Sequence, residues 1–169
     1  MTKARERRHT RIAAALAMAL LCHSAFAFAV FSMALALATG LQLGCGTLPA
    51  PYGTAANLLL VLQFPLVHSF LLSVRGRPWL HRLSPVGHGR TLALSTYVML
   101  GSGQLLLAFW AWTPTGTVWH TPHGVLGAVQ YALFALAWLF LVVALRDAGL
   151  PVQSGAAGWW ALLRDRPVA

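Results

Sequence analysis

Two long stretches of the sequence contain no charged side chain, and each is long enough to cross a membrane twice. They cover residues 12–74 and 91–145, and a membrane-spanning helix needs about 20 consecutive apolar residues. Loops rich in turn-forming residues divide them at residues 40–54 and 113–123. The pattern therefore predicts an all-α protein, an integral membrane four-helix bundle. The predicted spans are residues 12–38, 55–74, 91–112 and 124–145.

The basic residues predict which side of the membrane each loop occupies. All 12 Lys and Arg residues fall in residues 1–11, 75–90 and 146–169, which lie on one side if four spans alternate. The positive-inside rule assigns that side to the cytoplasm, so we expect both termini there, in a bacterial inner membrane. Residues 1–11 are then a basic cytoplasmic tail, and residues 146–169 a cytoplasmic tail with a short helix on the membrane interface.

The start of the chain also resembles a secretory signal peptide, since a basic segment precedes an apolar run. That run extends over residues 12–38, whereas the apolar core of a signal peptide has about 7–15 residues. We therefore expect residues 12–38 to be a retained membrane span.

The overall charge points to membrane partners rather than to nucleic acid. The chain is 58% hydrophobic and 9% charged, with a formal net charge of +9. Because the positive charges gather beside the predicted spans, they do not form a stripe for nucleic acid on a soluble fold. Other integral membrane subunits and anionic lipids are the expected partners, with Arg75, Arg77 and Arg82 placed to bind lipid headgroups.

Few groups in the predicted spans can carry chemistry. No acid lies there, which argues against a proton pump or ion-coupled transporter. His23 and His68 are either structural hydrogen-bonding groups, the favoured interpretation, or ligands of a haem or bacteriochlorophyll. No catalytic residue stands out. His120 and His123 lack the third ligand of a metal site, so no metal is expected.

The remaining polar side chains in the spans are expected to join helices, and two cysteines are expected to stay free. Hydrogen bonds between helices are the expected role of four side chains. They are Asn57, Gln63, Gln104 and Gln130.

Cys22 and Cys45 lie at different depths, so no disulfide is expected. Trp110, Trp112 and Trp119 mark the outer end of the spans as an aromatic belt.

Several stretches, taken in order, resemble one family. The segment NLLLVLQFPLVHSFLLSVRGRPWLHRLSP (residues 57–85) is similar to the Gln-His-Ser and Ala-Arg region of NnrU-type proteins and methanethiol S-methyltransferases. Ser95-Thr96-Tyr97, AFWAWTP, YALFALAWLFLVV and GWWALLRDRP then resemble later parts of the family in the same order. The resemblance covers residues 15–167. One departure is that Pro-Leu-Val separates Phe64 from His68, which displaces the glutamine of the motif.

The resemblance concerns the N-terminal half of the family alone. It implies that the S-adenosylmethionine site, built from an Arg-His-Pro element and two further helices, lies downstream of the part resembled. S-adenosylmethionine is therefore expected only with a second chain. The related haem-containing carotene isomerase of plastids implies that His68 is a possible haem ligand.

Three functions are compatible with these observations. The favoured one is a non-catalytic accessory subunit, packed within a larger respiratory or photosynthetic membrane complex and thus not an enzyme by itself. The second is the N-terminal half of a split S-adenosylmethionine-dependent methyltransferase. The third is a membrane protein that binds haem or pigment through His23 or His68.

Overall fold

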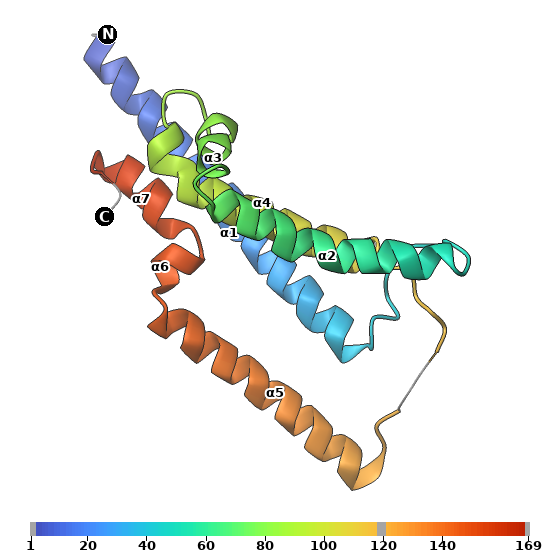
Figure 1. The fold of residues 1–169 in the computed structure, drawn as a ribbon. Coiled ribbons are helices and arrows are strands. Elements are labelled where there is room, and N and C mark those ends of the chain that lie inside the picture. Colours follow the sequence, from blue (N-terminus) through green and yellow to red (C-terminus); the bar gives the residue numbers. More distant parts are fainter. Residues whose placement is uncertain (1–2, 118–120, 168–169) are drawn as a thin grey trace.

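The computed structural model describes residues 3–117 and 121–167 of the chain, and the regular structure of these residues is entirely helical (Figure 1). Four helices are long and apolar enough to cross a membrane. They are α1 (Lys3–Ala38), α2 (Tyr52–Leu72), α4 (Gly89–Trp110) and α5 (Gly124–Asp147). Three short helices join or follow them, namely α3 (Arg77–Leu83), α6 (Leu150–Gln153) and α7 (Ala156–Arg164). The predicted all-α membrane fold is confirmed.

Helix α1 extends beyond the predicted span. It contains 36 residues and begins at Lys3, so the basic segment predicted as a tail is helical from that residue on. At about 1.5 Å per residue, α1 is about 54 Å long, compared with a hydrocarbon core of about 30 Å. Its first turns therefore project from the membrane, where Arg11 forms an ion pair with Asp165 after α7.

The second loop also contains a helix that the sequence pattern did not reveal. Helix α3 has a proline in its first turn and packs against α4. Ser84, which follows α3, shares a hydrogen bond of 2.8 Å with the hydroxyl of Thr96 on α4. This contact fixes the loop between α2 and α4 to the body of the protein.

The core lies where α1, α4 and α7 meet. Ala15 and Met18 on α1, Leu92 on α4 and Leu162 on α7 form one buried cluster. Helix α7 is the predicted short C-terminal helix, and the structure shows that one of its faces is buried against α1 and α4. Its opposite face carries Trp160, which is 44% exposed.

A small polar cluster secures α7. Cys22 donates to the carbonyl oxygens of Ser154, at 3.3 Å, and Ser95, at 3.6 Å. The hydroxyl of Ser95 donates to the Gly155 carbonyl at 2.6 Å and accepts from the backbone N–H of Trp159 at 3.2 Å. These bonds are possible because α7 approaches α4 closely at a glycine: a methyl group on Gly158 would lie 2.5 Å from the Ser95 hydroxyl.

Helix α5 stands apart from the other long helices (Figure 1). Gly127 is its only buried residue, and among the described elements α5 packs mainly against α6. Most of its apolar side chains are therefore exposed, which is compatible with lipid or with additional membrane helices.

Polar side chains join the helices as expected in most cases. The amide of Asn57 on α2 donates to the Thr113 carbonyl at 2.7 Å and accepts from the Thr113 N–H at 2.8 Å. Gln104 on α4 donates to the side-chain oxygen of Gln63 on α2 at 2.8 Å. Gln130 instead lines a surface pocket. Both cysteines are free, as predicted. The predicted roles of Trp119 and His120 lie outside the described residues.

Candidate functional site

The inner parts of α1, α2 and α4 line an open apolar cavity of about 490 Å³ together with the ends of α5 and α6. Its walls are formed mostly by aliphatic and aromatic side chains. The principal lining residues are Phe26, Val30, Phe64, His68, Leu72, Tyr97, Gly101, Leu105, Leu145 and Gln153. A volume of this size falls within the range of small-molecule sites.

The main polar feature of the cavity is a histidine and tyrosine pair. Nε2 of His68 on α2 and the hydroxyl of Tyr97 on α4 are joined by a hydrogen bond. Their ring centroids lie 4.7 Å apart. Phe64, one turn earlier on α2, stacks on the imidazole at a centroid distance of 5.0 Å and an angle of 26°. The imidazole is therefore fixed in orientation by both neighbours.

The other nitrogen of His68 lacks a partner among the described residues. Nδ1 is buried and makes no hydrogen bond in this part of the chain. It faces α4 at Gly101, where a methyl group would lie 3.6 Å from it. The backbone of α4 comes this close because Gly101 and the buried Ser102 are small. His68 thus lies in the wall of the cavity with its Nδ1 covered by α4.

The mostly apolar lining suits a small apolar molecule. Among the described residues, no Asp, Glu, Lys or Arg lines the cavity, and His68 is the only histidine there. S-adenosylmethionine has a sulfonium and a zwitterionic amino acid end, and burying such charges without partners is costly. The cavity therefore does not fit that cofactor.

The second candidate histidine serves a different part of the structure. Nε2 of His23 on α1 accepts a hydrogen bond of 3.2 Å from the indole N–H of Trp159 on α7. The two rings meet edge to face at 5.7 Å. His23 thus stabilises α7, while His68 faces the cavity. The two residues proposed as haem or pigment ligands belong to separate clusters.

The basic residues expected at lipid headgroups are exposed at the start of the α2 to α4 connection. Arg75, Arg77 and Arg82 all lie on the surface. The guanidinium of Arg82 is 5.8 Å from the ring centroid of Trp79, which is itself 51% exposed. A tryptophan beside basic residues is typical of the headgroup region.

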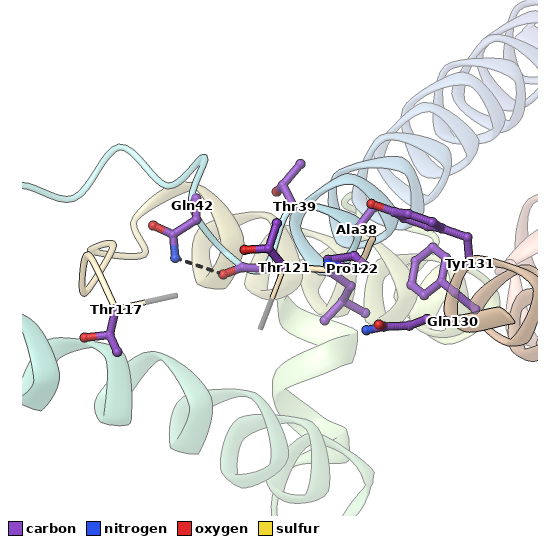
Figure 2. A pocket seen from close by; sticks show the side chains of 11 residues that line it. Ala38, Thr39, Gln42, Thr117, Thr121, Pro122, Gln130 and Tyr131 are labelled. Carbon is purple, nitrogen blue, oxygen red and sulfur yellow. Dashed lines mark hydrogen bonds between the residues drawn. The ribbon is translucent and has the colours of Figure 1, made fainter. Parts of the chain in front are cut away.

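A second pocket, of about 570 Å³, lies at the opposite end of the molecule, between the end of α1 and the start of α5 (Figure 2). Its polar side chains are uncharged: Thr39, Gln42, Thr117, Thr121 and Gln130. Two of these groups are already engaged locally. The hydroxyl of Thr39 donates to the Leu35 carbonyl at 2.9 Å, and the Gln42 amide donates to the Gly40 carbonyl at 3.2 Å. Among the described residues that line this pocket there is no histidine, in contrast to the cavity at His68.

Tyr97 is the cavity residue that sequence reasoning missed. In the sequence, Tyr97 stands out only as part of the Ser-Thr-Tyr segment of the family resemblance. Its contact with His68 depends on how α2 and α4 are aligned. The available signal was a phenol within an apolar span, since a buried hydroxyl in a membrane requires a partner.

Comparison with known proteins supports the resemblance to one family. The chain is 37% identical over 81 residues to a methanethiol S-methyltransferase of Crocosphaera subtropica, covering 47% of this chain and 30% of that protein. It is 30% identical over 138 residues to methanethiol S-methyltransferase 2 of Bradyrhizobium diazoefficiens, covering 75% and 50%. For the Mycobacterium tuberculosis methanethiol S-methyltransferase, the identity is 35% over 92 residues, covering 53% and 36%.

These relatives confirm the predicted resemblance and its partial extent. The chain spans about half the length of the curated relatives it matches, or less, which is consistent with a resemblance to the N-terminal half of the family. No protein-family model matches the chain. No solved structure matches it either.

Proposed function

We propose that this chain forms the acceptor-binding membrane part of an S-methyltransferase that acts on a small apolar thiol. The observation that carries the proposal is the apolar cavity with one oriented imidazole, His68, in a chain that resembles methanethiol S-methyltransferases. The relatives are named for methanethiol, which is a thiol small enough for this cavity.

The chemistry of such a thiol matches the cavity. A small thiol is apolar and enters a bilayer readily, and its S–H group is a weak hydrogen-bond donor with a weak acceptor sulfur. A wall of mostly aliphatic and aromatic side chains suits such a molecule, and the pair of His68 and Tyr97 is the main polar feature beside it. Phe64 and Tyr97 hold the imidazole in place. The residues of this chain therefore bind and orient the acceptor and exclude water.

The methyl donor belongs to a different part of the site. S-adenosylmethionine, when bound, supplies the methyl group, but the cavity offers it no charged partner. A further polypeptide segment, corresponding to the rest of the relatives' length, is proposed to hold it.

A turnover assay on native membranes tests this function. Membranes from cells that produce the protein with its natural partners are incubated with methanethiol and S-adenosylmethionine labelled in the methyl group. Labelled dimethyl sulfide in the headspace is the expected product. Matched membranes from cells that lack the protein provide the background. Equal product in both preparations would remove support for the proposal.

A non-catalytic accessory subunit is the second candidate function, and the exposure of α5 favours it. Phe140 and Leu133 are 65% and 61% exposed, on a helix that packs mainly against α6. Membrane helices of a larger complex would cover this surface. Purification in a mild detergent that yields stoichiometric membrane subunits, without thiol methylation, would favour this function. An absorption spectrum of the same fraction tests for haem or pigment on His68 or His23.

We further propose that the protein resides in the bacterial inner membrane with both termini in the cytoplasm, where Arg75, Arg77 and Arg82 contact anionic lipids. The distribution of basic residues supports this orientation. Cys45, which is exposed in the first loop, then faces outward, while Cys22 is buried.

Cysteine labelling tests the orientation. A membrane-impermeant maleimide added to spheroplasts is expected to label the protein, because Cys45 is accessible from outside. The Cys45→Ser variant is expected to remain unlabelled under the same conditions. Labelling only in inverted vesicles would mean that the orientation is the reverse.

A further inference from the structure

A gap lined by side chains of both helices separates α5 from α1. At one end of the gap, the pocket of about 570 Å³ lies between Ala38 of α1 and Gln130 of α5 (Figure 2). Toward the other end, an apolar pocket of about 210 Å³ lies between Phe26 of α1 and Leu145 of α5. Because α5 packs mainly against α6, the gap follows most of its length.

The side of α5 that faces the gap forms one continuous stripe. Phe134 lines the first pocket and Trp138, one helical turn later, lines the second, with their ring centroids 6.1 Å apart. From Gln130 to Leu145 the stripe extends about 22 Å, at about 1.5 Å per residue. One leaflet contributes about half of a hydrocarbon core of about 30 Å. The stripe is therefore longer than one leaflet is deep, and a membrane-spanning helix can cover its whole length.

Gln130 favours a helix over lipid chains as the occupant of the gap. Its side chain is exposed and lines the first pocket. It lies about 9 Å beyond the start of α5 at Gly124, within the predicted span. An amide in hydrocarbon needs a hydrogen-bond partner. An acyl chain has none, whereas a neighbouring helix provides one through a polar side chain.

We propose that a membrane-spanning helix from outside residues 1–169 docks in the gap between α1 and α5 and forms a hydrogen bond with Gln130. The relatives have further sequence from which such a helix can come, since this chain covers 30% and 50% of the length of two of them. This inference rests on the proposed function, in which a further polypeptide segment holds the methyl donor. It specifies where that segment meets this chain.

The docked helix also borders the cavity at His68. The pocket of about 210 Å³ and that cavity share Phe26, Val30, Leu145 and Gln153. A helix that lies against Phe26 and Leu145 therefore covers this side of the open cavity. The segment that carries the methyl donor is thereby brought next to the acceptor.

A photoreactive phenylalanine tests the docking site. p-Benzoylphenylalanine replaces either Phe134, which lines the gap, or Phe140, which is 65% exposed and lines neither pocket. Native membranes that contain the protein with its natural partners are irradiated, and the linked peptides are identified by mass spectrometry. We expect the probe at position 134 to link to an apolar membrane span from outside residues 1–169, and the probe at position 140 to give no such link.

Other products would overturn the inference. Links from position 134 to lipid alone would mean that acyl chains fill the gap. Links to α1 of the same chain would mean that the gap closes, and links to a second copy would mean that the chain forms an oligomer there. Equal linking from positions 134 and 140 would mean that the partner does not select the gap.

The Gln130→Leu variant tests the hydrogen bond to the docked helix. With the probe at position 134, the linked fraction in mild detergent is expected to fall about threefold, the usual worth of a hydrogen bond between membrane helices. Gln42→Leu is the matched control, because Gln42 lines the same pocket but its amide already donates to the Gly40 carbonyl. Equal linked fractions in the two variants would overturn the assigned contact with Gln130.

Methylation measured on the same membranes separates this inference from the proposed function. If the membranes methylate methanethiol but position 134 does not link to a further span, the docking site is wrong and the function stands. If position 134 links to such a span but no methylation occurs, the docking site stands and the function fails.

Discussion

Replacing His68 by glutamine is expected to lower kcat/KM for thiol methylation in native membranes by about 5- to 150-fold, equivalent to the roughly 1–3 kcal/mol lost when a polar group in apolar surroundings loses its hydrogen-bond partner. The substitution removes the ring that Phe64 stacks on and that binds the hydroxyl of Tyr97. Glutamine is similar in length and polar, so the cavity is not simply filled or left empty. The measurement is the rate of labelled dimethyl sulfide formation at several thiol concentrations.

His23→Gln provides the control for this change. His23 is the other histidine of the spans, and its bond to Trp159 lies outside the cavity. We expect this variant to lose some thermal stability but to keep its KM. A comparable loss of kcat/KM in both variants would mean that the histidines act through the fold, which would contradict the role assigned to His68.

Tyr97→Phe is a smaller change at the same site. It removes only the hydroxyl that binds Nε2 of His68, so the imidazole stays stacked but is free to rotate or to change tautomer. Loss of such a bond is worth about 1–2 kcal/mol, or roughly tenfold in KM. Tyr131→Phe on α5, where the tyrosine is 54% exposed, removes the same atom without effect on the cavity.

The four spans were predictable because a helix that crosses a membrane needs about 20 consecutive apolar residues. Helices α2 and α5 begin and end within a few residues of the predicted limits. Helix α1 was underestimated because charged residues end an apolar run but do not end a helix. Once a span is helical, its hydrogen-bonding pattern continues through Arg11 and back to Lys3.

The site was only half predictable. His68 stood out as an ionisable group in an apolar run, but its partner Tyr97 lies 29 residues away on another helix. Which residues meet depends on the rotation and alignment of α2 and α4. Their close approach rests on small residues such as Gly101, and such residues occur at many positions in membrane helices. The Asn57 contact with the Thr113 backbone was beyond sequence reasoning for the same reason.

The sequence did not reveal that α7 packs against α1 and α4, because its pattern of apolar residues has two interpretations. An amphipathic helix that lies on a membrane surface and one that packs on a neighbouring helix both show one apolar face. The distinguishing features are Gly155 and Gly158, which allow contact with Cys22 and Ser95. Glycine also occurs in flexible tails, so its role here is evident only from the structure.

Gly155→Ala is therefore expected to release α7 from the bundle. A methyl group there would lie 2.7 Å from the sulfur of Cys22 and 3.1 Å from the backbone of Ser95, and the residue has a φ of +74°. The backbone strain costs about 1–2 kcal/mol and the overpacking about 1–3 kcal/mol, a total of about 2–5 kcal/mol. Gly87→Ala is the matched control, because Gly87 has a φ of +83° with nothing within 4 Å. Its cost should be limited to about 1–2 kcal/mol.

Cys22 reports the release of α7 directly. Its thiol is fully buried and bonded to the Ser154 and Ser95 carbonyls, so a membrane-permeant maleimide should react with it slowly in the Cys45→Ser background. Reaction should become much faster with Gly155→Ala and stay slow with Gly87→Ala. Because Gln153 of α6 lines the cavity, release of α7 should also weaken thiol binding at His68. Fast labelling with unchanged thiol binding would show that the cavity closes without α6 and α7, and slow labelling in both variants would show that the contact at Gly155 is looser than the structure describes.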